Sequence, residues 1–432
     1  MNITFPTLMK EFGVGTATVQ WITTGYLLVL SICIPTSSFM SKRFKMKSTF
    51  LCAILLFIIG TLLGALAPAF SVLLLGRLIQ GVGTGLALPL MFNMTLSQAP
   101  QEKMGLLMGI ALMITGVAPA IGPTLGGTMI MHVGWRAIFW FLMPFLIFSL
   151  CAGSYAIRQS LSLSKPSFDL LGYFFLALSF ICLIVGASLS SQGWTSPRVL
   201  LLMLGFIVFL MLFVMHSLHH DNAIIHPQIF AVRPFTTSLI TYVSTNFMTL
   251  GLGFFIPNFL QLTLHKSALT AGVIMMPGAV VALLFVPLSG KIYDQRGVKG
   301  NALAAVIFMM LAQLLFFFNV SHATLISCLI IYMIYALGQG FSMGTYMTHA
   351  LAHIPEKESA DGNAIFNMLL QLFGAIGTSI VSSVVAASQK GGITASNTAI
   401  GTAHGYLLLV ALSVAAFICA LITIHDDHAA KA

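Results

Sequence analysis

Long apolar runs, separated by short polar links, follow one another along almost the whole chain. We count thirteen such runs, each about 20 residues or longer, which is enough for a helix to cross roughly 30 Å of hydrocarbon. Continuous apolar runs of this length are the signature of spanning helices. The pattern predicts an all-α integral membrane protein with spans near residues 17–40, 47–68, 70–96, 104–131, 136–158, 168–189, 197–217, 235–260, 269–290, 301–320, 323–349, 362–387 and 403–424.

The first dozen residues, MNITFPTLMKEF, break this pattern. They supply about nine apolar-compatible residues before Lys10 and Glu11, roughly half of what a span needs. They also lack the basic start and long apolar core of a signal peptide. We interpret them as the end of a further helix, which gives fourteen helices with the first one truncated.

Composition and charge agree with a membrane protein. Hydrophobic residues make up 58% of the chain and charged residues only 7%, against about 25% charged in a soluble domain. Most lysines and arginines fall in links on the same side as residues 41–47, which the positive-inside rule makes cytoplasmic. The net charge of +9 is thus explained by topology, and no nucleic-acid partner is predicted. All six cysteines lie inside apolar runs, so no disulfide framework is implied.

The two halves of the chain repeat each other weakly but in order. The matched positions are Gln80 with Gln339, Gly81 with Gly340, Gly85 with Gly344, and Gly116 with Gly374. Transporters are commonly built from such repeats, with the substrate site between them. We therefore predict an N-terminal helical bundle over 1–158, two inserted helices with their links over 159–234, and a C-terminal helical bundle over 235–432.

Several stretches carry a family resemblance: WITTGYLL, GRLIQGVGTGLALPL, WRAIFW, GKIYDQRG and GIALMITGVAPAIGPTLGG. Together they resemble the major facilitator superfamily, and within it the fourteen-helix drug:proton antiporters, over essentially the whole length. The resemblance implies the major facilitator fold, with two six-helix bundles plus two inserted helices. It also implies export of amphipathic, usually cationic compounds in exchange for protons by alternating access.

The stretch over 109–127 is the most specific of these, because its pattern GxxxxxGPxxGG resembles the signature that the family associates with export. Glycines on one helix face let a neighbouring backbone approach closely, and prolines permit a bend. We expect this face to seal the export cavity and to let the helix rock; static tight packing is the alternative. The motif residues are Gly109, Gly116, Pro119, Gly122, Pro123, Gly126 and Gly127.

Arg77 is the single charged residue well inside a predicted span. A central arginine costs roughly 2.5 to 3.5 kcal/mol on insertion scales, so it should face the protein interior and have a partner. Gln80 and Thr84 lie on its helix face. The resemblance implies that Arg77 takes part in proton coupling; the alternative is a side chain that snorkels to the outer headgroups.

No carboxylate is available inside the predicted spans, because all ten acidic residues fall at run ends or in links. The family usually keeps an aspartate shortly before positions that resemble Asn2 and Pro6, which here would precede Met1. We expect either that the chain as given lacks its beginning or that it couples protons differently, or not at all.

The stretch GKIYDQRG resembles the family's cytoplasmic gate motif, with Gly290, Asp294, Arg296 and Gly297 at the matching positions. Asp294 is expected to pair with a basic residue or a helix start when the inner side closes. An ordinary solvated loop is the alternative.

Polar residues inside the other spans predict the wall of a substrate cavity, because an amide is costly against lipid. Hydrogen bonding between helices would explain any one of them equally well. The candidate substrate-binding residues are Trp21, Tyr26, Gln80, Thr84, Asn246, Gln261, Asn367 and Gln371.

Other chemistry is not predicted. The link HSLHHDNAIIHP crowds four histidines, but we predict no metal site. The chain has no GxxxxGK[ST] loop and no assembled nucleophile and base, so we predict no ATP drive, no enzyme and no cofactor.

We predict a secondary active transporter that exports amphipathic, cationic drugs or toxic compounds in exchange for protons. An exporter of a native metabolite or lipid, or a truncated non-transporting membrane paralogue, are the alternatives, and neutral cargo stays open. The expected partners are a small-molecule substrate, protons and the lipid bilayer. The expected state is a monomer in a bacterial plasma membrane.

Overall fold

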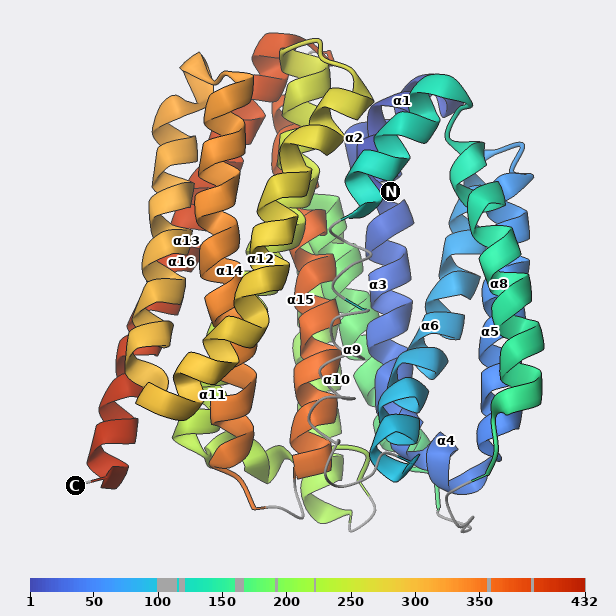
Figure 1. The fold of residues 1–432 in the computed structure, drawn as a ribbon, viewed down its shortest axis with the longest axis vertical. Helices are drawn as coiled ribbons and strands as arrows, with labels where there is room; N and C mark the ends of the chain where they lie inside the picture. The colour runs from blue at the N-terminus through green and yellow to red at the C-terminus, as the bar shows by residue number, and fades with distance from the viewer. Residues whose placement is uncertain are drawn as a thin grey trace.

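The computed structural model describes residues 1–98, 115, 121–159, 167–190, 193–220, 223–355, 359–389 and 392–431. Within these residues all regular structure is helical, and the long helices run side by side across one slab (Figure 1). The α-helices are α1 (Phe5–Phe12), α2 (Thr16–Val19), α3 (Trp21–Cys33), α4 (Ser37–Arg43), α5 (Met46–Ala65), α6 (Phe70–Gln98), α8 (Arg136–Ala156), α9 (Leu170–Leu189), α10 (Pro197–His219), α11 (Arg233–Asn258), α12 (Ala268–Arg296), α13 (Val298–Asn319), α14 (Leu325–Ala352), α15 (Ser359–Ser388) and α16 (Ala395–Lys431).

The predicted spans are confirmed wherever the structure describes them. Among the described residues, 12 helices are long and apolar enough to cross a membrane, and each lies on one of the predicted runs. The remaining run, 104–131, falls largely outside the described residues, apart from a helical segment over 121–132. The all-α membrane fold follows directly from the length and continuity of the apolar runs.

The predicted remnant at the start of the chain is α1, a helix of 8 residues. It ends at Gly13, whose φ of 63° lies in the left-handed region that glycine adopts without steric cost. Phe5 and Leu8 are buried, and the Phe5 ring lies 6.1 Å from that of Phe254. This short helix therefore packs into the core and contacts α11 (Arg233–Asn258) of the second half.

Two groups of helices meet along α3 and α15. In the first half α3, α5, α6 and α8 pack on one another, and in the second half α11 to α16 do so. Figure 1 shows the first group on the right, the second on the left, and α3 beside α15 between them. The two groups of helices therefore contact each other along α3 and α15.

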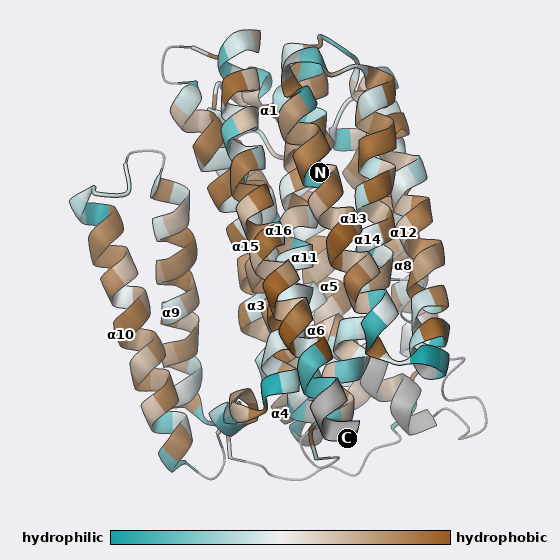
Figure 2. Cartoon of the chain, turned by 90° about the vertical axis from the view of Figure 1, so that its left-hand side faces the viewer, coloured by the Kyte–Doolittle hydropathy of each residue, from teal (hydrophilic) through white to brown (hydrophobic). Residues whose placement is uncertain are grey.

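The helices α9 and α10 form a separate pair at the side of the molecule (Figure 2). Helix α9 also packs against α15 and α3. Only 11% of the residues in the apolar segment of α10 are buried, against 72% in that of α11. Helix α10 therefore presents its apolar side chains to lipid. The pair sits where α9 can bridge the two groups of helices.

Glycines set the closest helix approaches at corresponding positions of the two halves. A Cβ added at Gly81 would lie 2.9 Å from a backbone oxygen of α3, and one added at Gly340 would lie 2.9 Å from a backbone oxygen of α12. About one turn later, a Cβ at Gly85 would meet Cys33 of α3, and one at Gly344 would lie 2.5 Å from the Val286 carbonyl oxygen of α12. The repeat noticed in the sequence thus has a spatial counterpart: α6 packs on α3 as α14 packs on α12.

Candidate transport site

Arg77 lies in α6 with its guanidinium turned toward α3. Its Nε donates to the Ile22 carbonyl oxygen at 3.2 Å, and its Nη1 donates to Gln80 Oε1 at 2.7 Å. Its guanidinium carbon lies 4.3 Å from the centre of the Tyr26 ring, a cation–π contact. Among the described residues no carboxylate forms an ion pair with it. Its positive charge is therefore held by neutral groups, Gln80 of its own helix and the Ile22 carbonyl oxygen and Tyr26 ring of α3.

The hydrogen bonds around Arg77 continue into a third helix. Gln80 Nε2 donates to Thr61 Oγ1 of α5 at 2.8 Å, and the Tyr26 hydroxyl donates to Thr84 Oγ1 at 2.9 Å. The structure thus brings together three predicted substrate residues of the first half, Tyr26, Gln80 and Thr84, around Arg77. Loss of the Thr61 hydroxyl would leave the buried Gln80 amide nitrogen without this acceptor, and an unsatisfied buried polar group costs about 1–3 kcal/mol.

A buried polar seam joins α2 and α3 to α15 and α9, and this seam was not predicted. Its six residues are each at most 8% exposed. The sequence did contain a signal for it, because Thr16, Gln20 and Thr24 recur at i, i+4 and i+8, a spacing that places them on one helix face. The hydrogen bonds of the seam are Thr24 Oγ1 to Thr378 Oγ1 at 2.6 Å, Thr16 Oγ1 donating to Gln389 Oε1 at 2.6 Å, and Gln20 Nε2 donating to Ser188 Oγ at 3.3 Å.

The predicted amides of the second half lie on α11 and α15. Asn246 Nδ2 donates across to the Leu370 carbonyl oxygen at 2.6 Å, so it ties the two helices together. Asn367 Nδ2 donates at 2.9 Å to the Asn363 carbonyl oxygen of its own helix. Gln371 is partly exposed and makes no hydrogen bond to another described residue. Of these three, Gln371 therefore has the amide most available to a ligand.

Trp21 and Gln261 lie apart from the group around Arg77. Trp21 is partly buried at the first turn of α3. Gln261 Nε2 donates to the Ile3 carbonyl oxygen at 3.2 Å and lines a groove of about 450 Å³ together with Lys10 and Lys266. The structure does not bring Gln261 to the other candidates, because it belongs to the end of the molecule where α1 packs.

The described part of the export motif packs against α12. A Cβ added at Gly127 would lie 2.6 Å from the Ala268 carbonyl oxygen, and one added at Gly272 would lie 2.4 Å from the carbonyl oxygen of Pro123. Gly126 is buried, whereas Gly122 is exposed with no atom within 4 Å of such a Cβ. The expected close approach to a neighbouring backbone thus exists at Gly127 but not at Gly122, and Gly126 faces the side chain of Ile3. Three further predicted members of the motif lie outside the described residues: Gly109, Gly116 and Pro119.

The gate motif ends α12. Gly297 has a φ of 73° and its N–H donates to the Tyr293 carbonyl oxygen at 2.8 Å, so this glycine stops the helix and starts the turn into α13. Gly290 lies inside α12 with open space around it, and Arg296 is exposed. The side chain of Asp294 lies outside what the structure describes, so its predicted pairing stays a prediction.

The WR pair before α8 forms a clamp with α1 that the sequence did not reveal. Trp135 Nε1 donates to Glu11 Oε2 at 2.6 Å, and Arg136 Nη1 donates to Glu11 Oε1 at 2.7 Å. Desolvation raises the pKa of Glu11, but these hydrogen bonds and the charge of Arg136 outweigh it and leave the pKa below its usual value. The clamp fixes the end of α1 to the start of α8.

Comparison with known proteins agrees with this architecture. Residues 1–378 match the family model of the Major Facilitator Superfamily. The chain is 33% identical over 393 residues to the lincomycin resistance protein LmrB of Bacillus subtilis, covering 90% of this chain and 82% of that protein. It is 29% identical over 385 residues to a multidrug resistance protein B homolog of Mycobacterium tuberculosis, covering 87% of this chain and 71% of that protein. Among solved structures, a bacterial homolog of the human lysosomal transporter Spinster, in an inward-facing unoccupied conformation, superposes with a TM-score of 0.69 at 15% identity, over 98% of this chain and 93% of that one.

The helical architecture and these matches define a multi-pass transporter of the bacterial cell membrane rather than an enzyme. The chain belongs to the Major Facilitator Superfamily, in the group whose members are named for multidrug and lincomycin resistance.

Proposed function

We propose that this protein exports amphipathic, mainly cationic compounds in exchange for protons by alternating access. The observation that carries the proposal is the buried charge of Arg77, held by Gln80 and by the Tyr26 ring inside the first half of the chain. A charge kept inside a span at an energetic cost is by default a functional group. The lincomycin and multidrug resistance relatives support drug-like cargo.

The moving parts would be two bundles, residues 1–158 and 235–432, with α9 and α10 inserted between them. In this proposal the polar seam closes the outer side. Each of its hydrogen bonds is worth only about 0.5–1.5 kcal/mol net, because water replaces the lost partner when the seam opens. A seam of hydroxyls and amides can therefore part and reform, where an apolar contact of the same size would stay shut.

The substrate would bind between the halves, against the aromatic ring of Tyr26 and the amide of Gln371. Aromatic faces attract cations, and an adaptable apolar wall accepts cargo of varied shape. Entry of a proton would accompany the change of access, so that the gradient drives export. Arg77 would position the protonatable group and not carry the proton itself, because a guanidinium does not deprotonate in proteins.

Transport in proteoliposomes tests this proposal. The purified protein is reconstituted, and movement of a dye panel and of lincomycin is followed with and without an imposed pH gradient. We expect the gradient to drive accumulation of cationic dyes, and a protonophore to abolish it. Movement that ignores the gradient would remove proton exchange from the proposal, and absence of movement for every compound would remove drug export.

A further inference from the structure

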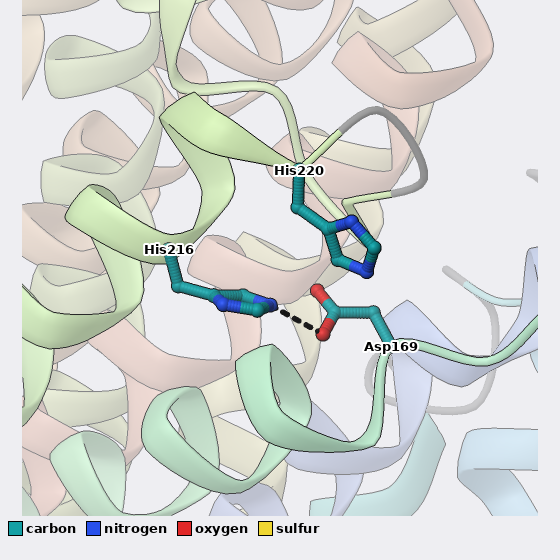
Figure 3. A group of neighbouring side chains, drawn as sticks. All are labelled: Asp169, His216 and His220. Atoms are coloured by element: carbon teal, nitrogen blue, oxygen red, sulfur yellow. Dashed lines mark hydrogen bonds and ion pairs between the residues drawn. The ribbon is translucent and has the colours of Figure 1, made fainter.

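We propose that Asp169, His216 and His220 form a binding site for a divalent transition-metal ion of the kind that Zn²⁺ represents. The site lies at the end of the inserted pair, where α9 begins and α10 ends. One ligand atom from each side chain lies within 4.8 Å of the others. Figure 3 shows the two imidazole rings and the carboxylate turned toward one another from the two helices.

The carboxylate of Asp169 is buried, and only one of its two oxygens accepts hydrogen bonds from the described residues. It caps α9, since Oδ1 accepts from the backbone N–H of Gly172 at 2.8 Å, and the same oxygen lies 2.7 Å from His216 Nε2. The side chain is 1% exposed, yet Oδ2 is buried with no hydrogen-bond partner among the described residues. An anionic oxygen left in that state is costly, and a bound cation would satisfy it.

The first turn of α9 is shaped to hold this carboxylate. A Cβ added at Gly172 would lie 2.2 Å from Asp169 Oδ2. Any other residue at position 172 would therefore push the free oxygen out of its place. Gly172 thus lets the carboxylate cap α9 through Oδ1 while Oδ2 stays in place beside it.

The two histidines are spaced to bind one ion. His216 and His220 are four residues apart, one helical turn, and their ring centres lie 5.0 Å apart. Ligands around a tetrahedral Zn²⁺ at about 2.1 Å lie about 3.4 Å from one another. His220 is exposed and follows the last residue of α10, so its ring can rotate inward by the small distance required.

Two nitrogens and one carboxylate oxygen suit Zn²⁺, Co²⁺, Ni²⁺ and Cu²⁺ better than Mg²⁺ or Ca²⁺, which prefer oxygen ligands only. Three protein ligands leave the fourth position to water, which can reach the site past the exposed ring of His220. The ion would staple α9 to α10, and α9 packs against both α15 and α3. Metal occupancy would thus brace the element that touches both halves.

The sequence predicted no metal here because it showed only the histidines. The missing ligand, Asp169, lies 47 positions before His216 in the chain. His219, in the middle of the histidine cluster, is not part of the site, because its Nδ1 lies 2.8 Å from the Met215 carbonyl oxygen. His219 therefore provides a matched control, an imidazole one residue away that points elsewhere.

Metal titration of the purified full chain tests the proposal, after removal of any affinity tag and treatment with a chelator. A second group of potential ligands, His349, His353 and Asp427, is also close enough to bind an ion. All titrations are therefore run in a His353→Gln background, which removes one ligand of that group. Co²⁺ is followed by its visible absorption, and Zn²⁺ affinity is measured by competition with a chromogenic chelator.

We expect one Co²⁺ per chain with the strong absorption of a tetrahedral site, and the same result for His219→Ala. Asp169→Asn keeps a capping oxygen and so keeps the fold. Loss of a residue that only supports a metal ligand costs roughly 10- to 100-fold in affinity, and both Asp169→Asn and His220→Ala should lower Zn²⁺ affinity by more than that. Zn²⁺ should also raise the unfolding temperature of the parent and His219→Ala, but not of His220→Ala. A His220→Ala variant that binds Zn²⁺ as tightly as its parent, or a His219→Ala variant that loses as much affinity, would show a plain histidine–aspartate pair and overturn the proposal.

Discussion

The two halves of the chain share their packing but not their charge. Gly81 of α6 and Gly340 of α14 make the same close approach to the neighbouring helix. The alignment that pairs Gln80 with Gln339 pairs Arg77 with Ala336, which is fully buried. Small residues that let helices approach are thus retained in both copies, whereas the ionic group exists in one. The close helix packing is thus repeated in both halves, whereas the charge of Arg77 has no counterpart at the matched position.

The second half fills the corresponding space with neutral hydrogen bonds. The Tyr335 hydroxyl, next to Ala336, donates to the Thr245 carbonyl oxygen at 2.8 Å and lies 2.8 Å from Thr249 Oγ1. These groups satisfy one another without a cation, so they need no counter-charge and no proton. On the function that we propose, the second half would therefore serve packing and cargo contacts, and the first half would serve coupling.

The largest expected effect comes from removing the charge of the first half. Arg77→Met should lower pH-driven export about 100-fold, the equivalent of losing charge-assisted hydrogen bonds worth about 1.5–3 kcal/mol. Arg77→Lys keeps the charge but loses the planar guanidinium that reaches Gln80 while lying over Tyr26. Its export should therefore lie between that of the parent and that of Arg77→Met. Export from proteoliposomes under a fixed pH gradient is the measurement.

Two variants serve as controls for Arg77. Arg198→Met removes an exposed arginine in the first turn of α10 and should leave export unchanged. Ala336→Arg places a charge in the other half, where only neutral partners exist, and should lower the yield of folded protein. Normal yield and export for Ala336→Arg would contradict the claimed difference between the halves.

The second largest effect is expected at the contact of Gly127 with α12, which joins the two halves. Gly127→Ala puts a Cβ against backbone atoms of α12 that cannot move aside, and should cost about 1–3 kcal/mol of stability or an equivalent share of export. Gly122→Ala, on the same segment but in open space, should change neither. Thermal unfolding in detergent is compared with export for both variants.

The pattern of losses separates the two interpretations of this motif. Export that falls while the unfolding temperature stays constant indicates rocking of the segment 121–132 on α12. Export and unfolding temperature that fall in parallel indicate static packing. Equal behaviour of Gly127→Ala and Gly122→Ala would show that the close approach has no consequence.

The sequence predicted the spans because each depends on a local property, about 20 continuous apolar residues. It also found Arg77 and Gln80, since a charge and an amide inside such a run stand out. It missed contacts between distant positions: Thr24 bonds Thr378 across 354 positions, and Glu11 pairs with Arg136 across 125. No local pattern encodes such pairs; they exist only once the helices are assembled.

Gln261 shows how little a polar residue in a span reveals about its partner, and its role in substrate binding stays a prediction. An amide in an apolar run predicted a cavity residue, but the π-helical turn Phe259–Thr263 directs Gln261 to the Ile3 carbonyl oxygen. Polarity within a span indicates that a partner exists, and it does not indicate which one.

The smallest expected effect concerns the hydrogen bonds that hold the helix ends of the two halves. The first half is closed by the charged clamp of Glu11 with Trp135 and Arg136, and the second by neutral caps such as that of Thr324, which accepts from the N–H of Ser327 at 3.2 Å. Because the folded pKa of Glu11 is lowered, the clamp contributes stability above the ordinary pKa of about 4.3 and loses it as pH falls through the folded pKa.

Glu11→Gln should therefore lower stability at neutral pH by up to about 1 kcal/mol, since Glu11 and Arg136 are 37% and 39% exposed and screened by solvent. The difference between Glu11→Gln and the parent should shrink below pH 4.5 and vanish at lower pH. Thr324→Ala in the second half should cost about 1 kcal/mol at every pH, because no titrating group is involved. Unfolding temperatures of the three proteins between pH 3 and pH 8 decide the matter: a loss for Glu11→Gln that stays constant down to pH 3 would mean that the clamp holds by shape and not by charge.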